Sequence, residues 1–130
     1  VDDYSIQDAV TFLPRVARDE MGDLVRQAQV IASPSEHDGT PNSLLEAIAC
    51  GCFPVAGDIE SVREWITGGK NGLLFDPGDP EAISQAILRG LTEAELRESA
   101  QGINQELIMN NADYKSVMAK ASAFINSIIA

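Results

Sequence analysis

Two carboxylates flank a short segment whose composition is typical of an anion-binding loop. Asp38 and Glu46 are separated by seven residues, which begin Gly39-Thr40-Pro41-Asn42-Ser43-Leu44. A glycine lets the backbone come close to a ligand, and a helix that starts after it presents unpaired N–H groups and a positive dipole end. Carboxylates repel a phosphate but accept hydrogen bonds from hydroxyls. The segment therefore favours a ligand that carries both phosphates and sugar hydroxyls.

A helix is expected to begin within this segment, at about Asn42 or Ser43, with Thr40 or Asn42 as its cap. The backbone N–H groups of Asn42, Ser43 and Leu44 would then point outward from its first turn. Glu46 lies four residues after Asn42, on the same face of the helix. Oriented amides would let a chain of net charge −11 hold an anion without lysines. The alternative, on the residues alone, is that the two acids are solvated or capping groups and the loop is only a turn.

The elements around this segment follow the pattern of β-α-β units in a parallel sheet. We predict strands near residues 10–13, 30–34, 53–56 and 72–75, with helices on both faces of the sheet. Helices are expected over residues 19–28, 42–50, 60–66 and 113–129, with two more starting at about 79 and 92. Ligands of such sheets lie at the carboxyl ends of strands, which is where the loop over residues 34–40 falls.

Local signals define the later helices. Asp79-Pro80-Glu81 combines a capping Asp, a Pro at the first position and an acid in the first turn. Thr92-x-x-Glu95 predicts a capping box for the next helix. Two sets of apolar residues are expected to be buried. They are Ile83, Ala86, Ile87 and Leu91 in one helix, and Tyr114, Val117, Met118, Ala121, Phe124, Ile125 and Ile128 in the last.

Several classes of protein are excluded by composition. The chain has 9 Lys+Arg against 20 Asp+Glu and no basic cluster, so nucleic acid and anionic membranes are poor partners. It has no apolar run long enough to span a membrane, no G-x-G-x-x-G after a strand and no P-loop. Cys50 and Cys52 are expected to be reduced and mostly buried, which indicates a reducing compartment such as the cytoplasm. His37 is expected to be an exposed loop residue and not a catalytic base.

The run from Ser33 to Gly51 resembles the donor-site signature of the retaining glycosyltransferases of the GT-B fold, family four (group 1). That signature is an acid, seven residues and a Glu, leading into Ala-x-Ala-x-Gly and Pro-Val. The matching residues here are Asp38, Glu46, Ala47-Ile48-Ala49-Cys50-Gly51 and Pro54-Val55. The stretches over residues 12–35 and 70–79 also look like the family. The resemblance covers nearly the whole chain, from Val10 to the final helix.

The resemblance implies an α/β fold with a Rossmann-like parallel sheet, the C-terminal half of a GT-B donor-binding domain. Residues 1–130 would be a partial C-terminal nucleotide-sugar binding domain, with the N-terminal acceptor domain absent. The parent enzyme would move a sugar from a nucleoside-diphosphate sugar to an acceptor with retention, and the isolated chain would be inactive. The acceptor, whether glycan, lipid or small molecule, is not indicated. No metal and no cofactor would be required.

The resemblance also implies roles for single residues. Asp38, where Glu is usual in the family, matches the acid that hydrogen-bonds the hydroxyls of the transferred sugar. Glu46 matches the acid that binds the ribose hydroxyls of the nucleotide. These two are the expected catalytic residues. The donor would also be held by Gly39, Thr40, Pro41, Asn42, Ser43 and Leu44, with the diphosphate on the amides of the last three. The loop at Arg15-Val16 lies where the base pocket is partly built. The family's Arg and Lys that neutralise the diphosphate lie in the first strand-helix part of the domain, and nothing before Val10 here can supply them.

Two alternatives remain open. The chain could be a non-catalytic sugar-nucleotide-binding or scaffold module of the same fold. It could also belong to another GT-B enzyme, such as a sugar-nucleotide epimerase or a phosphorylase, although epimerases carry a differently placed donor motif.

Overall fold

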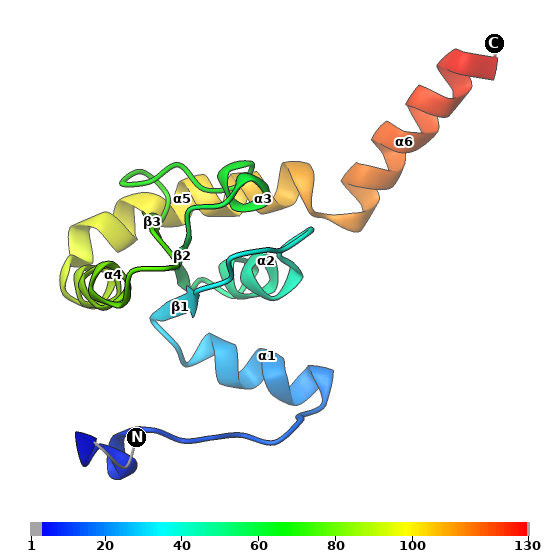
Figure 1. Ribbon diagram of the computed structural model, residues 1–130. Helices are drawn as coiled ribbons and strands as arrows, with labels where there is room; N and C mark the ends of the chain where they lie inside the picture. Colours follow the sequence, from blue (N-terminus) through cyan, green and yellow to red (C-terminus); the bar gives the residue numbers. More distant parts are fainter. Residues whose placement is uncertain (1–3, 130) are drawn as a thin grey trace.

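The computed structural model describes residues 4–129, apart from the side chains at positions 18, 19 and 129. Three strands form one parallel sheet in the order β1-β2-β3 (Figure 1). The elements in chain order are η2 (Gln7–Ala9), α1 (Arg18–Arg26), β1 (Val30–Ser33), α2 (Asn42–Ala49), β2 (Phe53–Gly57), α3 (Glu60–Arg63), β3 (Leu73–Phe75), α4 (Pro80–Thr92), α5 (Ala94–Asn111) and α6 (Tyr114–Ile129).

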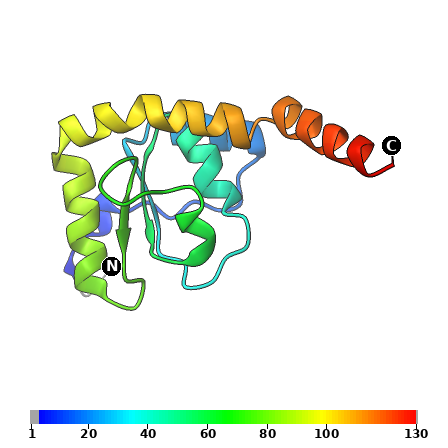
Figure 2. The ribbon, with the colours of Figure 1, turned by 90° about the horizontal axis from the view of Figure 1, so that it is seen from above.

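Helices cover both faces of the sheet, as the alternation of apolar runs predicts. Successive side chains of a strand point to opposite faces, so each strand contributes to two apolar clusters. Ala56 and Leu74 pack with α2 and α3 on one face, whereas Val55 and Leu73 pack with α4 on the other. Helix α5 crosses one end of the strands and contributes to both clusters (Figure 2). The Rossmann-like α/β fold expected from the sequence is therefore confirmed.

Strand β2 is the centre of the sheet, and every one of its residues is buried. It contains Pro54, which has no N–H for a ladder and is unusual in a central strand. The Phe53 N–H donates to the Gln29 carbonyl on the β1 side, at 2.9 Å. Since N–H groups alternate along a strand, position 54 faces the β3 side, where pairing begins only at Val55 with Leu73. The proline therefore removes no hydrogen bond from the ladder.

The strand predicted over residues 10–13 is wrong. This segment is extended but pairs with no strand in the described part of the chain, and the Phe12 side chain is 79% exposed. The composition fits a strand, but a strand forms only where a neighbour supplies a hydrogen-bonded ladder. Sequence periodicity contains no information about that neighbour.

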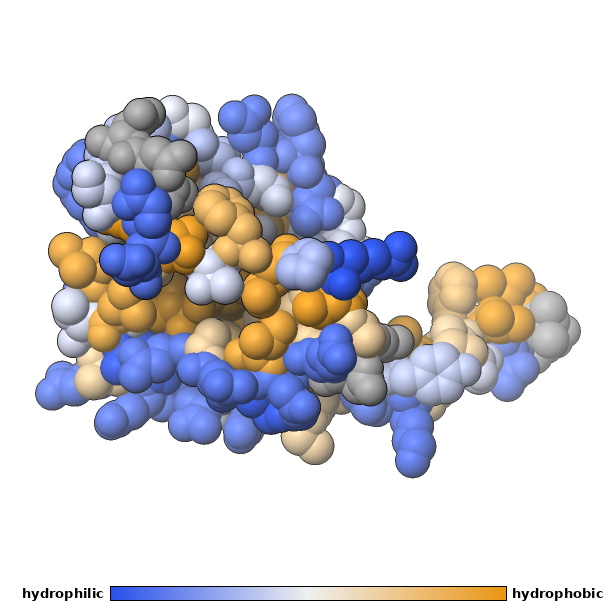
Figure 3. Space-filling view, turned by 90° about the horizontal axis from the view of Figure 1, so that it is seen from below, coloured by the Kyte–Doolittle hydropathy of each residue, from blue (hydrophilic) through white to orange (hydrophobic). Residues whose placement is uncertain are grey.

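The apolar stripe of the last helix is also not core. Helix α6 extends away from the sheet (Figure 2). The side chains of Tyr114, Phe124 and Ile128 are exposed, and Val117, Met118 and Ile125 are at least 40% exposed. Figure 3 shows apolar side chains gathered along this helix and across the face seen from below. Helical periodicity identifies an apolar face correctly here, but it cannot say whether the rest of the chain covers that face.

Helix α4 begins as its sequence predicts. The Asp79 carboxylate accepts hydrogen bonds from the N–H groups of Glu81 and Ala82, at 3.0 and 3.3 Å. Ala86 is buried, and Ile83 and Ile87 are half-buried against the sheet. Leu91, however, is 46% exposed and does not belong to the buried face. It lies in the last turn of α4, where the helix passes the edge of the sheet.

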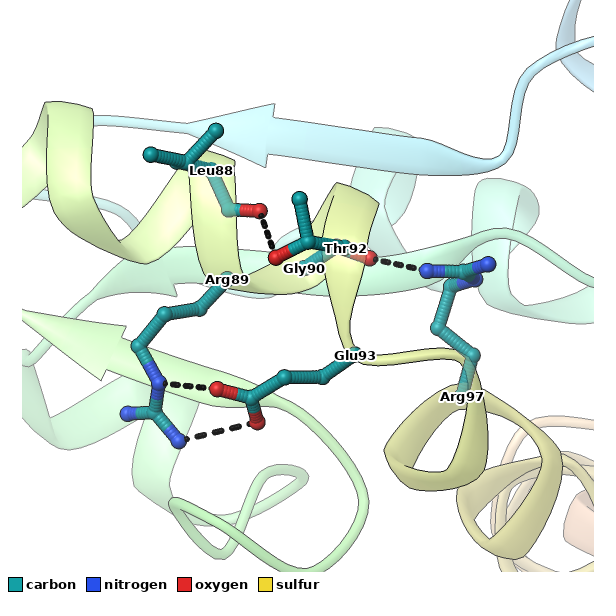
Figure 4. A network of polar contacts seen from close by, with 6 residues as sticks. All are labelled: Leu88, Arg89, Gly90, Thr92, Glu93 and Arg97. Carbon is teal, nitrogen blue, oxygen red and sulfur yellow. Dashed lines mark hydrogen bonds and ion pairs between the residues drawn. The ribbon is translucent and has the colours of Figure 1, made fainter.

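The capping box expected at Thr92 does not form. Thr92 is the last residue of α4, and its hydroxyl donates to the Leu88 carbonyl at 2.8 Å (Figure 4). An ion pair between Arg89 and Glu93, 2.7 Å long, spans the corner between α4 and α5. Arg97 Nη1 closes that corner by donating to the Gly90 carbonyl at 2.8 Å. The end of α4 thus uses the threonine that a capping box would need for the start of α5.

Gly72 lies where the backbone before β3 meets β2. A Cβ at this position would lie 2.8 Å from the Pro54 carbonyl oxygen and 2.8 Å from Ile66 Cγ2. Gly72→Ala is expected to lower the free energy of unfolding by about 1–3 kcal/mol, because backbone and core would have to shift. Gly102→Ala is the matched control, since a Cβ there meets nothing within 4 Å. That exposed helical site should instead gain about 0.5–1 kcal/mol. Urea denaturation measures both, and equal effects would contradict the close packing at Gly72.

Candidate functional site

An acidic cleft of about 520 Å³ opens where β1 and β2 end. One side is the loop that leaves β1, and the other is α3 with its flanking residues. The cleft is lined by Glu36, His37, Asp38, Gly39 and Thr40 on the loop side, and by Ile59, Glu60, Ser61, Glu64 and Trp65 on the α3 side. Neither Lys nor Arg occurs among these described lining residues. The cleft therefore favours hydroxyl donors and disfavours anions.

The loop that bears Asp38 is held at both ends. At its start it passes close to Gly57, where a Cβ would lie only 2.6 Å from the Ser35 carbonyl oxygen and 3.3 Å from Pro77 Cβ. At its other end Pro41 is buried. The glycine that ends β2 thus allows the loop to pack directly on the sheet, which fixes where the exposed Asp38 side chain lies.

The start of α2 differs in detail from the sequence-based prediction. The residue preceding the helix is Pro41, which makes no side-chain cap, so neither Thr40 nor Asn42 caps the helix. The Asn42 N–H donates back to the Thr40 carbonyl at 2.8 Å and does not point outward. The buried proline forces this tight turn before the helix. The N–H groups of Ser43 and Leu44 have no acceptor within the described residues, so the first turn offers two amides and not three.

A second hollow, of about 470 Å³, lies between α1 and α2 and runs along α2 from its first turn to its C-terminal end. Its lining is mostly apolar. It comprises Met21, Gly22, Val25, Ile31, Ser43, Glu46, Ala49 and Cys50. Glu46 also borders a smaller hollow together with Asn42. Asp38 and Glu46 therefore line different hollows, and the two available amides of α2 lie between these acids in the sequence.

The remaining residues singled out in the sequence lie largely as expected. His37 is exposed in the loop. Both cysteines are free; Cys52 is buried and Cys50 is half-buried. The Cys52 thiol donates to the carbonyls of Val25 and Ala28, at 3.1 and 3.3 Å, and burial raises the pKa of this thiol. These contacts fasten the end of α1 to the start of β2.

Across the described part of the chain, no group of three or more His, Cys, Asp and Glu side chains is arranged to hold a metal ion. None of the described helices combines the length and the apolar character needed to cross a membrane.

The α3 side of the cleft was missed by sequence reasoning. Its residues follow the end of β2, a strand that the sequence does indicate. Because parallel neighbours end at the same edge of a sheet, the segment after β2 had to lie beside the loop after β1. The signal that could have found Glu60, Glu64 and Trp65 was therefore their position in the chain, since their residue types match no motif.

An ion pair anchors this side of the cleft to the sheet. Arg63 Nε donates to Asp58 Oδ1 at 2.6 Å, and Arg63 Nη2 donates to the Asp58 carbonyl at 3.3 Å. The Asp58 N–H donates to the Phe75 carbonyl of β3 at 2.7 Å. The hydrogen bond from Arg63 holds the pKa of Asp58 below its usual range.

Comparison with known proteins identifies the family. The family model described as "Glycosyl transferases group 1" matches residues 1–106. The chain belongs to this family. A D-inositol 3-phosphate glycosyltransferase of Gordonia bronchialis is 36% identical over 103 residues, which cover 76% of this chain and 22% of that protein. An O-antigen chain mannosyltransferase B of Escherichia coli is 33% identical over 98 residues, covering 74% of this chain and 25% of that protein. The chain thus spans about a quarter of the length of these group 1 relatives.

Solved structures agree on the fold. Sucrose-phosphate synthase from Thermosynechococcus elongatus superposes with a TM-score of 0.87 at 20% identity, covering 98% of this chain and 32% of that one. Anabaena Alr3699/HepE, solved in complex with UDP-glucose, superposes with a TM-score of 0.69 at 20% identity, covering 93% of this chain and 34% of that one. These neighbours show the GT-B glycosyltransferase fold of the group 1 family.

The Asp58–Arg63 pair makes a pH-dependent contribution to the stability of this site. The pKa of Asp58 is lower in the folded state than in the unfolded state. The contribution is therefore present above the unfolded pKa and is lost as the pH falls through the folded pKa. Arg63→Gln is expected to raise the pKa of Asp58, as measured by carboxyl carbon NMR. Arg89→Gln is the control, because it removes the partner of Glu93 and should leave Asp58 unchanged. An unchanged Asp58 pKa in Arg63→Gln would refute the pairing.

Proposed function

We propose that this chain is the donor-binding part of a glycosyltransferase that moves a sugar from a nucleoside-diphosphate sugar to an acceptor with retention. The observation that carries the proposal is the pair of unlike hollows near the start of α2. One is acidic and holds Asp38, and the other is mostly apolar and holds Glu46. Together with the N–H groups at the start of α2, the two hollows offer three kinds of surface. A nucleotide sugar has three matching parts: a polyhydroxy sugar, a charged diphosphate and a largely apolar nucleoside.

The nucleoside is assigned to the hollow between α1 and α2. Its apolar side chains, among them Met21, Val25 and Ile31, offer a surface for a base, and sequestering apolar area there favours binding. Glu46 borders this hollow and is exposed, so its carboxylate can accept hydrogen bonds from ribose hydroxyls. This is the role that the sequence resemblance implies for the second acid.

The diphosphate is assigned to the start of α2. The Ser43 and Leu44 N–H groups have no acceptor within the described residues, so they and the positive end of the helix dipole are available to an anion there. The same groups would stabilise the charge that develops on the departing nucleoside diphosphate. Arg and Lys residues of the full-length protein would supply the rest of the compensating charge, in which case the reaction needs no metal.

The transferred sugar is assigned to the acidic cleft. Asp38 lies in its loop wall, next to Gly39 and Thr40, and a carboxylate there can accept hydrogen bonds from sugar hydroxyls. Asp is one methylene shorter than the Glu that is usual in the family, so the sugar would have to approach the loop closely. Gly39 permits this, since a Cβ at that position meets nothing within 4 Å.

The comparisons support a sugar-nucleotide donor without naming it. The curated relatives are called glycosyltransferases, and the structure of Anabaena HepE contains UDP-glucose. Retention rests on the spacing of Asp38 and Glu46, which matches the retaining family four signature. The free cysteines favour a reducing compartment such as the cytoplasm. The transferase activity is assigned to the full-length protein, because the acceptor must be held beside the donor.

Glu46→Gln tests the ribose assignment in the full-length protein. The change keeps size and helix propensity but removes a charge-assisted hydrogen bond of about 1.5–3 kcal/mol. Binding of the nucleoside diphosphate is therefore expected to weaken roughly ten- to a hundredfold in calorimetry, with little change in melting temperature. Glu106→Gln is the matched control, since Glu106 is an exposed helical glutamate of α5 outside both hollows. If Glu46→Gln binds the nucleoside diphosphate as tightly as the wild type, Glu46 does not bond the ribose and the assignment is wrong.

Asp38→Asn tests the sugar assignment. Asn keeps the shape of Asp but accepts weaker hydrogen bonds, so sugar discrimination and the transfer step should suffer. Binding of the bare nucleoside diphosphate should change less, because Asp38 does not line the hollow assigned to the nucleoside. The measurement is calorimetry with the nucleoside diphosphate and with its sugar ester, beside turnover. Equal loss for both ligands would show that the two hollows do not divide the donor as proposed. Donor binding without any transfer by the wild type would support a non-catalytic module.

A further inference from the structure

Two buried asparagines form a closed hydrogen-bond network between the turn before β3 and α5. Asn71 and Asn104 are 4% and 5% exposed and are the two buried polar side chains of the described residues. Asn71 Nδ2 donates to Asn104 Oδ1 at 3.0 Å, and Asn104 Nδ2 returns a bond to the Asn71 carbonyl at 2.9 Å. The two residues are 33 positions apart, so this exchange links the turn before β3 to α5.

The same network reaches the cleft through Trp65. Asn71 Nδ2 also donates to the Trp65 carbonyl at 2.9 Å, and Asn71 Oδ1 accepts from the Thr67 N–H at 2.7 Å. Trp65 and the preceding Glu64 line the cleft on the side facing Asp38. The backbone that follows α3 is therefore hydrogen-bonded to Asn71 through the carbonyl of Trp65, and Trp65 is one of the residues that line the cleft.

Helix α5 also packs against α2, the helix that follows the loop with Asp38. Ile108 of α5 packs against the cluster that contains Leu44 and Leu45 of α2, and Asn104 lies one turn earlier on α5. In Figure 2, α5 runs as one continuous helix along one end of the sheet, beside α2. The helix that bears the proposed diphosphate site and the turn that bears Trp65 thus share one support.

The amides do more than fill space. Burying two amides is costly unless their hydrogen bonds are made, and an apolar pair could fill the same volume without that requirement. The network instead specifies one position for residues 65–71, because its bonds fit only that arrangement. We infer that Asn71 and Asn104 are positioning residues that set the distance between the Trp65 wall and Asp38, and thereby the affinity for the transferred sugar. This inference rests on the proposed function.

The test compares sugar nucleotide with bare nucleotide in the full-length protein. Asn104→Ala should weaken binding of UDP-glucose or GDP-mannose by about fivefold or more, since small displacements of positioned groups are costly. UDP and GDP lack the sugar that the displaced wall would position, so they should bind within about twofold of the wild type. Asn104→Ser, which leaves a smaller cavity, serves if the Ala variant is too unstable to measure.

The matched control is Val55→Ala. Val55 lies fully buried in the cluster on the α4 face, away from the cleft, so its loss lowers the melting temperature without touching the network. A second readout follows Trp65 directly, by fluorine NMR of protein labelled with 5-fluorotryptophan, with the Trp65 resonance assigned through Trp65→Phe. The resonance should shift in Asn104→Ala and stay in place in Val55→Ala.

The outcomes are distinguishable. A selective loss of sugar-nucleotide affinity together with a shifted Trp65 resonance supports the inference. An unmoved resonance, or equal weakening of both kinds of ligand, overturns it and leaves the proposed function standing. A wild-type protein that binds neither sugar nucleotides nor nucleoside diphosphates refutes the proposed function itself, and the inference with it; the first titration decides this before any variant is compared.

Discussion

The burial of β2 is the constraint from which the rest of the site follows. All five of its residues are buried, so it must pair on both edges and be covered on both faces. Parallel pairing then brings the carboxyl ends of β1 and β2 to one edge of the sheet. The loop with Asp38 and the start of α3 have to emerge side by side there. Gly57 at the end of β2 completes the arrangement, because its missing side chain leaves room for the Ser35 carbonyl.

Features encoded by neighbouring residues could be predicted from the sequence, whereas features that depend on distant partners could not. Strand β2, helix α2 and the Asp79 cap are local, and each was found. The segment over 10–13 and the stripe of α6 have the right composition and periodicity, but the structure supplies neither a ladder for the first nor a cover for the second. The capping box at Thr92 failed for a different reason: Thr92 is still the last helical residue of α4, where its hydroxyl donates to the Leu88 carbonyl, and Glu93 takes the N-cap position of α5.

The candidate site shows the same division. The acids and the amides of α2 were predicted from one continuous motif, and the bond from the Asn42 N–H to the Thr40 carbonyl reduced the expected set of three outward amides to two. The α3 wall could have been inferred from topology. The Asn71–Asn104 network could not, because nothing in the spacing of two asparagines 33 residues apart indicates that one meets the other. Side-chain pairing across such a separation is a property of the packed chain.

The distribution of charge explains how an acidic chain could hold a donor in one orientation. The start of α2 supplies roughly half a positive charge, far less than a diphosphate requires. Four carboxylates line the cleft, those of Glu36, Asp38, Glu60 and Glu64, while the second hollow is mostly apolar. A diphosphate is repelled from the first and poorly solvated in the second, so the helix start is its best position. In the proposed complex this would leave the sugar and the nucleoside only one orientation. In the proposed complex, orientation would follow more from this exclusion than from the strength of any single contact, and the cations of the full-length protein would add affinity to a geometry already set.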